Sequence, residues 1–576
     1  MVNVKNLFGM AVMATALVGC ASNDDITPNG NENESNKVGT AYAKFTIQLP
    51  TVSGTRADDP KPGTPSFEGG TADEYAVKDA QLVIFQKSGA SEGDYTFVET
   101  VNIGNLEPWT DNTPNTGVTR YANITAQLNG VSLDKTGNEY FALIILNNQG
   151  ESKVTLPTSG TYSAWNVANK VQCAAAFLDS SNGFYMANAP QYSTGEPTTL
   201  VPIKGVYSTK AEAQTNPATT VYVERGMAKV TVNGSDFTIN DASSTYNTDK
   251  VTINNWTLDV LNKSTFPVHV TTGLKTDFSA IWTTPRFVAT GSTPQRVYWG
   301  KDPNYNKSTL TTVAKCQEEF YIVDNNGKTY NGDPSSTFTW SANTTPLYCL
   351  ENTFDLNNMK QGQTTRVVFK ATYTPHNLTG TDKTFFMIGN NTQIWTKDAL
   401  EAQITSKAKE MLKSTTVVVT INTDAPLLKG GSHLLSSADV TIMDGSVDKT
   451  AAFDYATLNT KLGLNNTETD ANGNPKVGIK TYENGECYYI AGIKHFNELT
   501  PWASGQAYGT DNATFLGRYG VLRNNWYDLT VSKVSAPGYP DVPVVDPKTP
   551  DDEDTKYINV EVKILDWAKR SQQVEL

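Results

Sequence analysis

The chain has 576 residues, of which 18% are charged and 38% hydrophobic, and its formal net charge is −13. This length is too great for one hydrophobic core, so we expect two or more domains. The abundance of Thr, Asn, Ser, Gly and Tyr is typical of β-rich extracellular sandwiches. The acidic balance gives no electrostatic support to nucleic-acid binding. Beyond the N-terminus no apolar run reaches about eighteen residues, so we expect no transmembrane helix.

The N-terminus has the pattern of a processing signal. Lys5 precedes the apolar stretch LFGMAVMATALV, which runs into LVGC and ends at Cys20. This pattern resembles a bacterial lipoprotein signal, so we predict that residues 1–20 are a signal peptide and that Cys20 is lipidated, with palmitate among its acyl chains. A plain secretory signal with a chance cysteine is the alternative. The acidic pair in ASNDD, after Cys20, resembles the surface-export signal of Bacteroidia lipoproteins.

One well-patterned strand follows a polar tether that is expected to be disordered. In AYAKFTIQLP, apolar residues alternate with polar ones, which predicts a strand with one buried face; they are Ala43, Phe45, Ile47 and Leu49. Pro50 ends the pattern. The turn-prone segment that follows contains Arg56, and Ala57 comes directly after it.

Two globular blocks are expected next, residues 57–223 and residues 224–536. In the first, DAQLVIFQ and YFALIILNN are predicted to be buried strands, AWNVANKVQCAAAFL is a helix candidate, and VYVERGMAKVTVNG marks the boundary. Strand candidates in the second are NNWTLDVLN, TRVVFKATYTP, TTVVVTIN, ECYYIAGI and WYDLTVSKV. One helix, DALEAQITSKAKEMLKS, is predicted from apolar residues at every fourth position, with Asp398 as its N-cap.

No motif for catalysis, a cofactor or a metal is found, so we expect no enzyme activity. The cysteines after Cys20 lack zinc-like spacing, and they are either disulfide-bonded in one of three complete pairings or free buried thiols; they are Cys173, Cys316, Cys349 and Cys487. The histidines lie far apart in the sequence and are interpreted as structural; they are His269, His376, His433 and His495. The segments DANGNP and DNNGKTYNGD are interpreted as turns rather than calcium loops.

The C-terminal segment, residues 537–576, changes composition. APGYPDVPVVDPKTPDDEDT is rich in proline and acidic residues, which predicts a solvated, semi-rigid spacer. A strand pattern follows and then shifts phase, as a bulge would produce; its apolar residues are Ile558, Val560, Val562 and Ile564, then Leu565 and Trp567. Val574 and Leu576 form an apolar end.

This last strand has no domain of its own after the spacer. An isolated strand cannot satisfy its backbone hydrogen-bonding groups, so it must join a sheet. It either folds back onto its own chain or completes a sheet in a neighbouring molecule. Cleavage after Arg56 would open a strand position in the neighbour by releasing residues 21–56, and the head-to-tail contact would propagate into a filament. Arg120 and Arg225 are alternative cleavage sites, but both lie in or beside predicted core strands.

Several of these segments together resemble the fimbrillins of Bacteroidia, the subunits of protease-matured type V pili, and most of all the major subunits of Mfa-type short fimbriae. The segments are the lipoprotein signal, GTRAD, VERGMAKV, YYIAGI, VLRNNWYDLTV, the spacer with INVEVKILDW, and the terminal VEL. The resemblance implies a mainly β fold with two tandem transthyretin-like β-sandwich domains and a C-terminal donor strand on the Pro/Asp-rich spacer. It implies cleavage between Arg56 and Ala57 by an Arg-specific protease, and assembly by donor-strand exchange.

The resulting hypothesis is a structural fimbrial subunit, the shaft component, that supports adhesion, biofilm formation or virulence. Its partners would be neighbouring subunits and accessory tip and anchor proteins, and the precursor would be held in the outer membrane by its lipid. The alternative is a surface glycan-binding lipoprotein in which Trp109, Trp165 or Trp256 stacks on sugars. A surface glycosidase is a remote third hypothesis, because it would need two carboxylates suitably spaced across a cleft.

Overall fold

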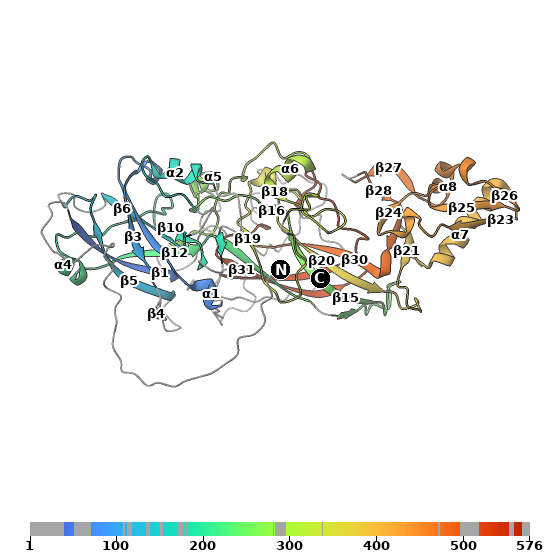
Figure 1. Cartoon of the computed structure of the whole chain (residues 1–576), viewed down its shortest axis with the longest axis horizontal. Helices are drawn as coiled ribbons and strands as arrows, with labels where there is room; N and C mark the ends of the chain where they lie inside the picture. Colours follow the sequence, from blue (N-terminus) through green and yellow to red (C-terminus); the bar gives the residue numbers. More distant parts are fainter. Residues whose placement is uncertain are drawn as a thin grey trace, which may run out of the picture.

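The structure is a computed structural model. It describes residues 40–50, 71–106, 110–111, 118–133, 139–149, 154–170, 177–179, 183–234, 236–279, 282, 288, 295–336, 338–470, 473–495, 518–551 and 558–566. The fold is mainly β, as predicted, and the molecule is elongated, with three regions along its long axis (Figure 1). We call them the N-terminal domain (residues 40–225), the central domain (226–374 with 483–566) and the lobe (385–482). No helix among the described residues is long and apolar enough to cross a membrane.

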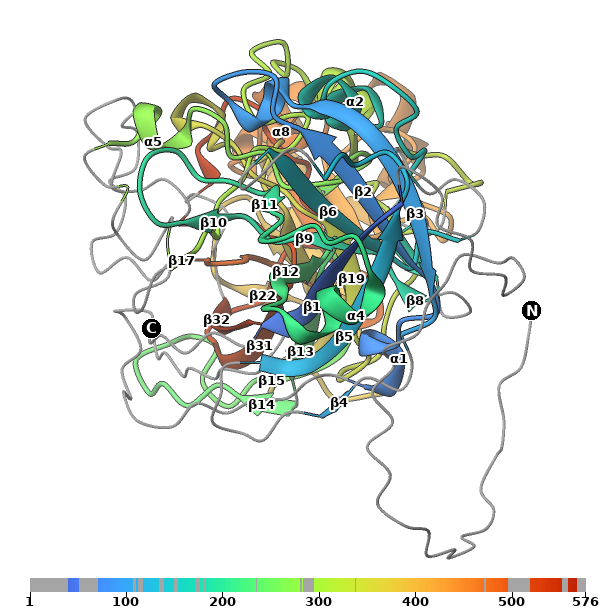
Figure 2. The same ribbon diagram turned by 90° about the vertical axis from the view of Figure 1, so that its left-hand side faces the viewer.

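The N-terminal domain is built on a nine-stranded sheet. In order across the sheet, its strands are β3 (Thr96–Gly104), β2 (Ala80–Gln86), β6 (Tyr140–Leu146), β9 (Met186–Asn188), β12 (Thr219–Arg225), β1 (Ala41–Pro50), β5 (Val118–Leu128) and β4 (Thr110–Asp111), with β11 (Val201–Pro202) pairing β6. Phe45 of β1 and Ile124 of β5 share one buried cluster with Leu82 of β2 and Val101 of β3. The two halves of the sheet therefore pack face to face, as the end-on view in Figure 2 shows.

Short elements decorate this domain and its border with the central domain. The strands are β7 (Leu178–Asp179), β8 (Gly183–Phe184), β10 (Gln191–Tyr192) and β17 (Gln295–Arg296). The helices are α1 (Ala72–Tyr75), η1 (Glu92–Asp94), α2 (Tyr162–Ala168), α4 (Lys210–Thr215) and α5 (Leu274–Asp277). Within the predicted helix at 164–178, residues 164–168 are helical as part of α2, which begins at Tyr162; Phe177 is also helical, and Leu178 begins β7. Residues 171–176 lie outside the described ranges.

The central domain has two four-stranded sheets. One contains β19 (Leu347–Leu350), β13 (Met227–Asn233), β31 (Asn525–Val534) and β32 (Ile558–Asp566), and the other β14 (Asp236–Thr238), β15 (Lys250–Asp259), β20 (Arg366–Thr374) and β30 (Glu486–Gly492). Inward residues of both, such as Tyr527, Trp256 and Phe369, share one core. Smaller elements are β16 (Leu261–Asn262), β18 (Phe320–Tyr321), α6 (Val313–Glu319), η2 (Leu356–Asn358) and η5 (Glu483–Gly485). The transthyretin-like assignment stays a prediction.

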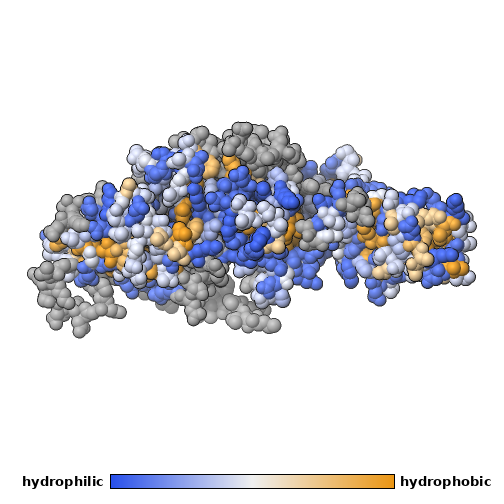
Figure 3. Space-filling model, turned by 90° about the horizontal axis from the view of Figure 1, so that it is seen from above, coloured by the Kyte–Doolittle hydropathy of each residue, from blue (hydrophilic) through white to orange (hydrophobic). Residues whose placement is uncertain are grey.

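The lobe is inserted between β20 and β30. Its elements are β21 (Phe385–Ile388), β22 (Ile394–Trp395), α7 (Lys397–Leu412), β23 (Val417–Ile421), η3 (Pro426–Leu428), β24 (Gly431–His433), β25 (Val440–Asp444), β26 (Val447–Asp448), η4 (Thr450–Ala452), α8 (Tyr455–Lys461), β27 (Asn465–Thr469), β28 (Pro475–Val477) and β29 (Ile479–Tyr482). Hydrophobic residues gather over part of its surface (Figure 3), and Val418 and Val447 are more than half exposed. Helix α7 buries Leu400, Ile404 and Ala408, as its spacing predicts.

Two local predictions for the helix and the tail are wrong. The N-cap of α7 is Thr396, whose hydroxyl accepts from the Ala399 amide at 3.2 Å, and Asp398 lies in the first turn instead. No bulge occurs in β32 at Leu565: its pairing with β31 is regular through Asp566. The irregularity lies on the partner strand, between Val531 and Lys533. The phase shift in the sequence therefore does not mark an extra residue in the β32 backbone.

The expected solvated spacer is also a wrong prediction for residues 537–551. This segment lies against the central domain, where Val542, Val545 and Asp551 are 1%, 0% and 3% exposed. Its prolines do favour extended backbone, but the valines between them find buried positions. Residues 552–557 lie outside the described ranges.

Candidate assembly site

Strand β1 lies in the interior of the N-terminal sheet. It pairs with β5 in an antiparallel register along its whole length and with β12 in a parallel register from Phe45 to Gln48. The alternating residues predicted to face the core are buried, with exposures of 0–2%; they are Ala41, Ala43, Phe45, Ile47 and Leu49. The first described strand of the chain is therefore a central strand, not an edge.

Further contacts hold β1 beside its pairing with β5 and β12, some of them from the segment that contains α4. Tyr42 and Tyr207 exchange backbone hydrogen bonds of 2.8 and 2.9 Å. Lys44 donates from Nζ to the Gln214 carbonyl at 3.0 Å, and Thr46 donates to the Asn123 side chain at 2.7 Å. The Tyr42–Tyr207 bridge thus adds backbone pairing to β1 outside the stretch that pairs with β12, and the two side-chain contacts strengthen its attachment.

Loss of β1 would expose a long groove between β5 and β12. Burial of Phe45, Ile47 and Leu49 contributes about 1.5–3 kcal/mol for each side chain. The two strand edges would also lose their hydrogen-bond partners, and unpaired edges of this kind readily add another strand. A vacated groove would therefore need a new apolar strand.

Strand β32 lies at the edge of a central-domain sheet in its own chain. It pairs antiparallel with β31, from Ile558 opposite Val534 to Asp566 opposite Asn525. This is the self-pairing that the sequence left open. Among the described strands only β31 pairs with it, so β32 has one paired edge where β1 has two. Ile558, Val560, Val562, Ile564 and Leu565 all lie on β32, and only their backbone is described.

The predicted processing residues lie outside the described ranges; they are Cys20, Arg56 and Ala57, and with them Trp567, Val574 and Leu576 of the tail. The alternative cleavage sites are described. Arg225 is 1% exposed, and its Nε donates to the Glu74 carbonyl at 2.7 Å. Arg120 lies in β5, where its backbone pairs with Leu49 of β1. A protease would need local unfolding to reach either peptide bond.

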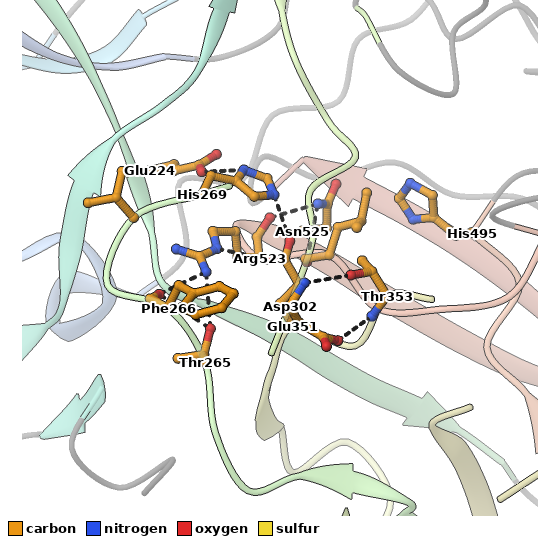
Figure 4. Close-up of polar contacts among 12 residues, drawn as sticks. Glu224, Thr265, Phe266, His269, Asp302, Glu351, Thr353, His495, Arg523 and Asn525 are labelled. Carbon is orange, nitrogen blue, oxygen red and sulfur yellow. Dashed lines mark hydrogen bonds and ion pairs between the residues drawn. The ribbon is translucent and has the colours of Figure 1, made fainter. Parts of the chain in front are cut away.

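Sequence reasoning missed a buried ionic network at the junction between the N-terminal and central domains (Figure 4). His269 lies between two carboxylates, with Nδ1 2.9 Å from Glu224 and Nε2 2.8 Å from Glu351. Arg523 Nε lies 3.2 Å from Glu351, and Arg296 Nη2 lies 3.1 Å from Glu224. Glu224 belongs to β12 of the N-terminal domain, whereas Glu351 follows β19 of the central domain. The imidazole of His269 therefore bridges carboxylates of the two domains.

The network sets the ionisation of its members. Burial opposes the charged form of His269, but attraction from Glu351 and Glu224 outweighs it and raises its pKa. Burial likewise opposes ionisation of Glu351, but His269 and Arg523 lower its pKa to about 2. The interpretation of His269 as structural agrees with this geometry. No local signal reveals the network, because its members are far apart in the sequence.

Two of the three tryptophans suggested as sugar platforms are buried. Trp256 and Trp165 are 0% and 6% exposed. Their indole N–H groups donate to the carbonyls of Ala342 at 3.2 Å and Thr155 at 2.7 Å. Neither ring face is open for stacking, and Trp109 lies outside the described ranges.

The cysteines and suggested calcium loops are likewise structural in the described part of the chain. Cys316, Cys349 and Cys487 are free and buried, and Cys173 lies outside the described ranges. Asp324 and Asp470 accept hydrogen bonds from residues four or five positions later, as turn residues do. No group of three or more metal-binding side chains is found among the described residues.

Comparison with known families gives a match in the region of β30, β31 and β32. Residues 480–573 match the family described as major fimbrial subunit protein type IV, fimbrillin, C-terminal. The C-terminal region of this chain is therefore similar to that of the fimbrillins. A comparison with curated proteins gives no match to this chain.

Several solved structures show a weak likeness to this chain over most of its length. A fimbrilin from Porphyromonas gingivalis W83 is 11% identical, with 92% of this chain and 99% of that chain covered and a TM-score of 0.34. A putative cell adhesion protein from Parabacteroides distasonis is 12% identical, with 92% and 99% covered and a TM-score of 0.36. The C-terminally truncated tip fimbrial protein Mfa3 from Porphyromonas gingivalis is 12% identical, with 91% and 100% covered and a TM-score of 0.28. TM-scores below 0.5 do not establish a common fold.

Proposed function

We propose that this protein is a fimbrillin, a structural subunit of a surface fimbria and its shaft component, and that it polymerises by donor-strand exchange. The observation that carries the proposal is the position of β1, which is central in its sheet although it stands at the N-terminal end of the described chain. It is followed within six residues by Arg56 in a polar, turn-prone sequence. A single cut there separates a fully integrated strand from the domain that it completes.

The proposed maturation follows from effective concentration. While β1 is covalently attached, it occupies the groove between β5 and β12 at a high local concentration and blocks any competitor. Cleavage between Arg56 and Ala57 by an Arg-specific protease removes this advantage. The C-terminal strand of a neighbouring subunit then takes the vacant position, and Ile558, Val560, Val562, Ile564, Leu565 and Trp567 supply its apolar residues, with Val574 and Leu576 as a second short segment.

In a single subunit, before any exchange, β32 pairs with β31 of its own chain. This pairing is compatible with a later exchange. A strand with one paired edge is easier to release than one with two. In the groove, the same strand would gain partners on both edges. The resulting contact is head-to-tail and therefore builds a filament.

We also propose how the protein is exported and where it is located. The precursor would travel as a lipoprotein anchored in the outer membrane through Cys20, and the polymer would form at the cell surface. Its partners would be other copies of this chain and accessory tip and anchor subunits. The function of the polymer would be adhesion or biofilm formation.

The test uses the non-lipidated precursor and an arginine-specific endoprotease in trace amounts. We expect Ala57 as the new N-terminus, loss of residues 21–56, and a ladder of oligomers on gel filtration. The Arg56→Lys variant is the matched control, because it keeps the charge and resists the protease. Fully processed protein that keeps β1 bound and stays monomeric would refute the proposal.

A further inference from the structure

Residues 537–551, which we call the strap, run over the outer face of the sheet that contains β20 and β30. The inward residues of these strands, Phe369 and Tyr489, face the sandwich core. Their neighbours Val368 and Tyr488 face outward and form a second cluster with Val542 of the strap. The strap therefore covers a sheet face that would otherwise be exposed to water.

The first half of the strap is held by backbone hydrogen bonds and aromatic side chains. Tyr539 and Tyr488 exchange backbone hydrogen bonds of 2.7 and 2.8 Å. The Tyr482 hydroxyl donates to the Gly538 carbonyl at 2.9 Å, and the Val542 amide donates to the Asn325 carbonyl at 3.1 Å. Aromatic-lined grooves suit proline-rich segments, which lose little entropy on docking because they are already extended.

The second half is held by a buried arginine and an apolar pocket. Arg366 pairs with Asp259 at 2.9 Å, both fully buried, and donates from Nη2 to the Pro543 carbonyl at 2.6 Å. Val545 is fully buried in a cluster with Leu310 and Cys316.

The strap fits closely at its end as well. A Cβ at Gly362 would lie 3.2 Å from Cα of Pro547, so no larger residue fits there without a shift. The last strap residue, Asp551, accepts from the Thr364 hydroxyl at 3.0 Å, and its amide donates to the Met359 carbonyl at 3.3 Å. The strap is thus anchored at both ends.

We infer that the strap stays fixed to the central domain during assembly and that the exchangeable arm begins only after Asp551. This inference rests on the proposed function, and it names which part of the tail a second copy of this chain receives. The arm would comprise residues 552–576. Ile558 follows Asp551 by seven residues, so its strand begins at most about 25 Å from the anchor. The receiving groove of the neighbour must lie within that reach.

Cys316 offers a probe of the strap, because its thiol lies in the same buried cluster as Val545. The experiment uses the non-lipidated full chain with Cys20 and Cys173 replaced by serine, so that the remaining thiols are Cys316, Cys349 and Cys487. Maleimide labelling of each cysteine is followed by peptide mass spectrometry. We expect equally slow labelling of Cys316 in the precursor and in assembled fimbriae, within about twofold.

Two variants make the result decisive. Val545→Asp places a charge in the pocket, so Cys316 should label at least about tenfold faster; Val545→Ala is the milder substitute if the aspartate variant does not fold. Truncation after Lys556 removes residues 557–576 of the arm, including β32, and keeps the strap, so Cys316 should stay protected in the monomer. Fast labelling of Cys316 in fimbriae or in this truncated monomer would overturn the inference. Failure to form fimbriae with Cys316 still protected would count against the proposed function instead.

Discussion

The imidazole Nε2 of His269 lies 2.8 Å from the Glu351 carboxylate, and both side chains are buried where the N-terminal and central domains meet. The other nitrogen faces Glu224 at 2.9 Å. One residue from the central domain thus contacts a carboxylate from each domain. The surrounding cations, Arg523 and Arg296, contact the far oxygens of the same two carboxylates.

We predict that this junction weakens as the pH rises from neutral to alkaline. The pKa of His269 is raised in the folded protein, because its two carboxylates outweigh the cost of burial. Its contribution is therefore complete below the ordinary histidine pKa of about 6.5 and is lost as the pH rises through the folded value. Glu351 acts in the opposite range: its pKa is lowered to about 2, so its contribution is lost only as the pH falls below about 4.5.

The measurement is the free energy of unfolding of wild type and His269→Gln between pH 6 and pH 10. The variant leaves two carboxylates facing each other without the imidazolium, which costs roughly 3–5 kcal/mol at pH 6. The difference between the two proteins should shrink as the pH rises. His376→Gln is the control, because the His376 side chain is 47% exposed and its ion pair is with one carboxylate, that of Asp249. A difference that is independent of pH would contradict the assignment.

We predict that Phe45→Ala accelerates assembly after cleavage. Phe45 is fully buried near the middle of β1, and truncation of a buried phenylalanine costs roughly 3–5 kcal/mol. The loss weakens retention of the cleaved strand without changing the C-terminal arm. The rate at which oligomers appear after arginine-specific cleavage should therefore rise at least about tenfold. Gln48 is a partly exposed position on the same strand, so Gln48→Ala should keep the assembly rate within about twofold of wild type. Equal assembly rates for the two variants would mean that the release of β1 does not limit assembly.

The strands and the main helix were predictable because they carry their own periodicity. The alternation in β1 and the fourfold spacing in α7 predicted which side chains are buried, and both patterns are observed. These signals are local: each follows from neighbours a few positions apart. The N-cap of α7 was misplaced by two residues because Thr396 and Asp398 are both good capping residues.

The strap and the junction were not predictable, because their partners are distant in the sequence. Proline and aspartate in residues 537–551 indicate a solvated spacer by composition. The groove that holds the strap is built from Tyr488, Arg366 and Cys316, which no pattern in the strap itself reveals. His269 meets Glu224 and Glu351 only after the two domains have folded. The position of β32 was an open choice, since a strand pattern specifies a buried face and not a partner.

We predict that Arg366→Met destabilises the central domain and loosens the strap. The substitution leaves Asp259 as a buried carboxylate without its cation, which costs roughly 3–5 kcal/mol. It also removes the hydrogen bond to the Pro543 carbonyl. The unfolding temperature should fall, and Cys316 should label at least about tenfold faster in native buffer.

The double variant Arg366→Met with Asp259→Leu provides the comparison for that effect. It removes both charges, so part of the lost stability should return. The strap should remain looser than in wild type, because the bond to Pro543 is still absent. If the double variant regains full protection of Cys316, the arginine holds the strap only through the general stability of the sandwich.

We predict that Val562→Asp separates folding from assembly. Val562 pairs with Leu529, a residue of the central core, on a strand that has one paired edge among the described strands. A charge there should therefore weaken the pairing of β32 with β31, while the rest of the central domain stays folded. In the groove between β5 and β12 the same position would face the core in place of a β1 residue, where an unpaired charge is not tolerated. Oligomers should be absent after cleavage, although Ala57 still appears as the new N-terminus. Lys563 is the next residue along the strand, so in the groove it would lie on the opposite face, away from the core. The Lys563→Asp variant should therefore assemble. Assembly of both variants would show that β32 is not the strand that the groove receives.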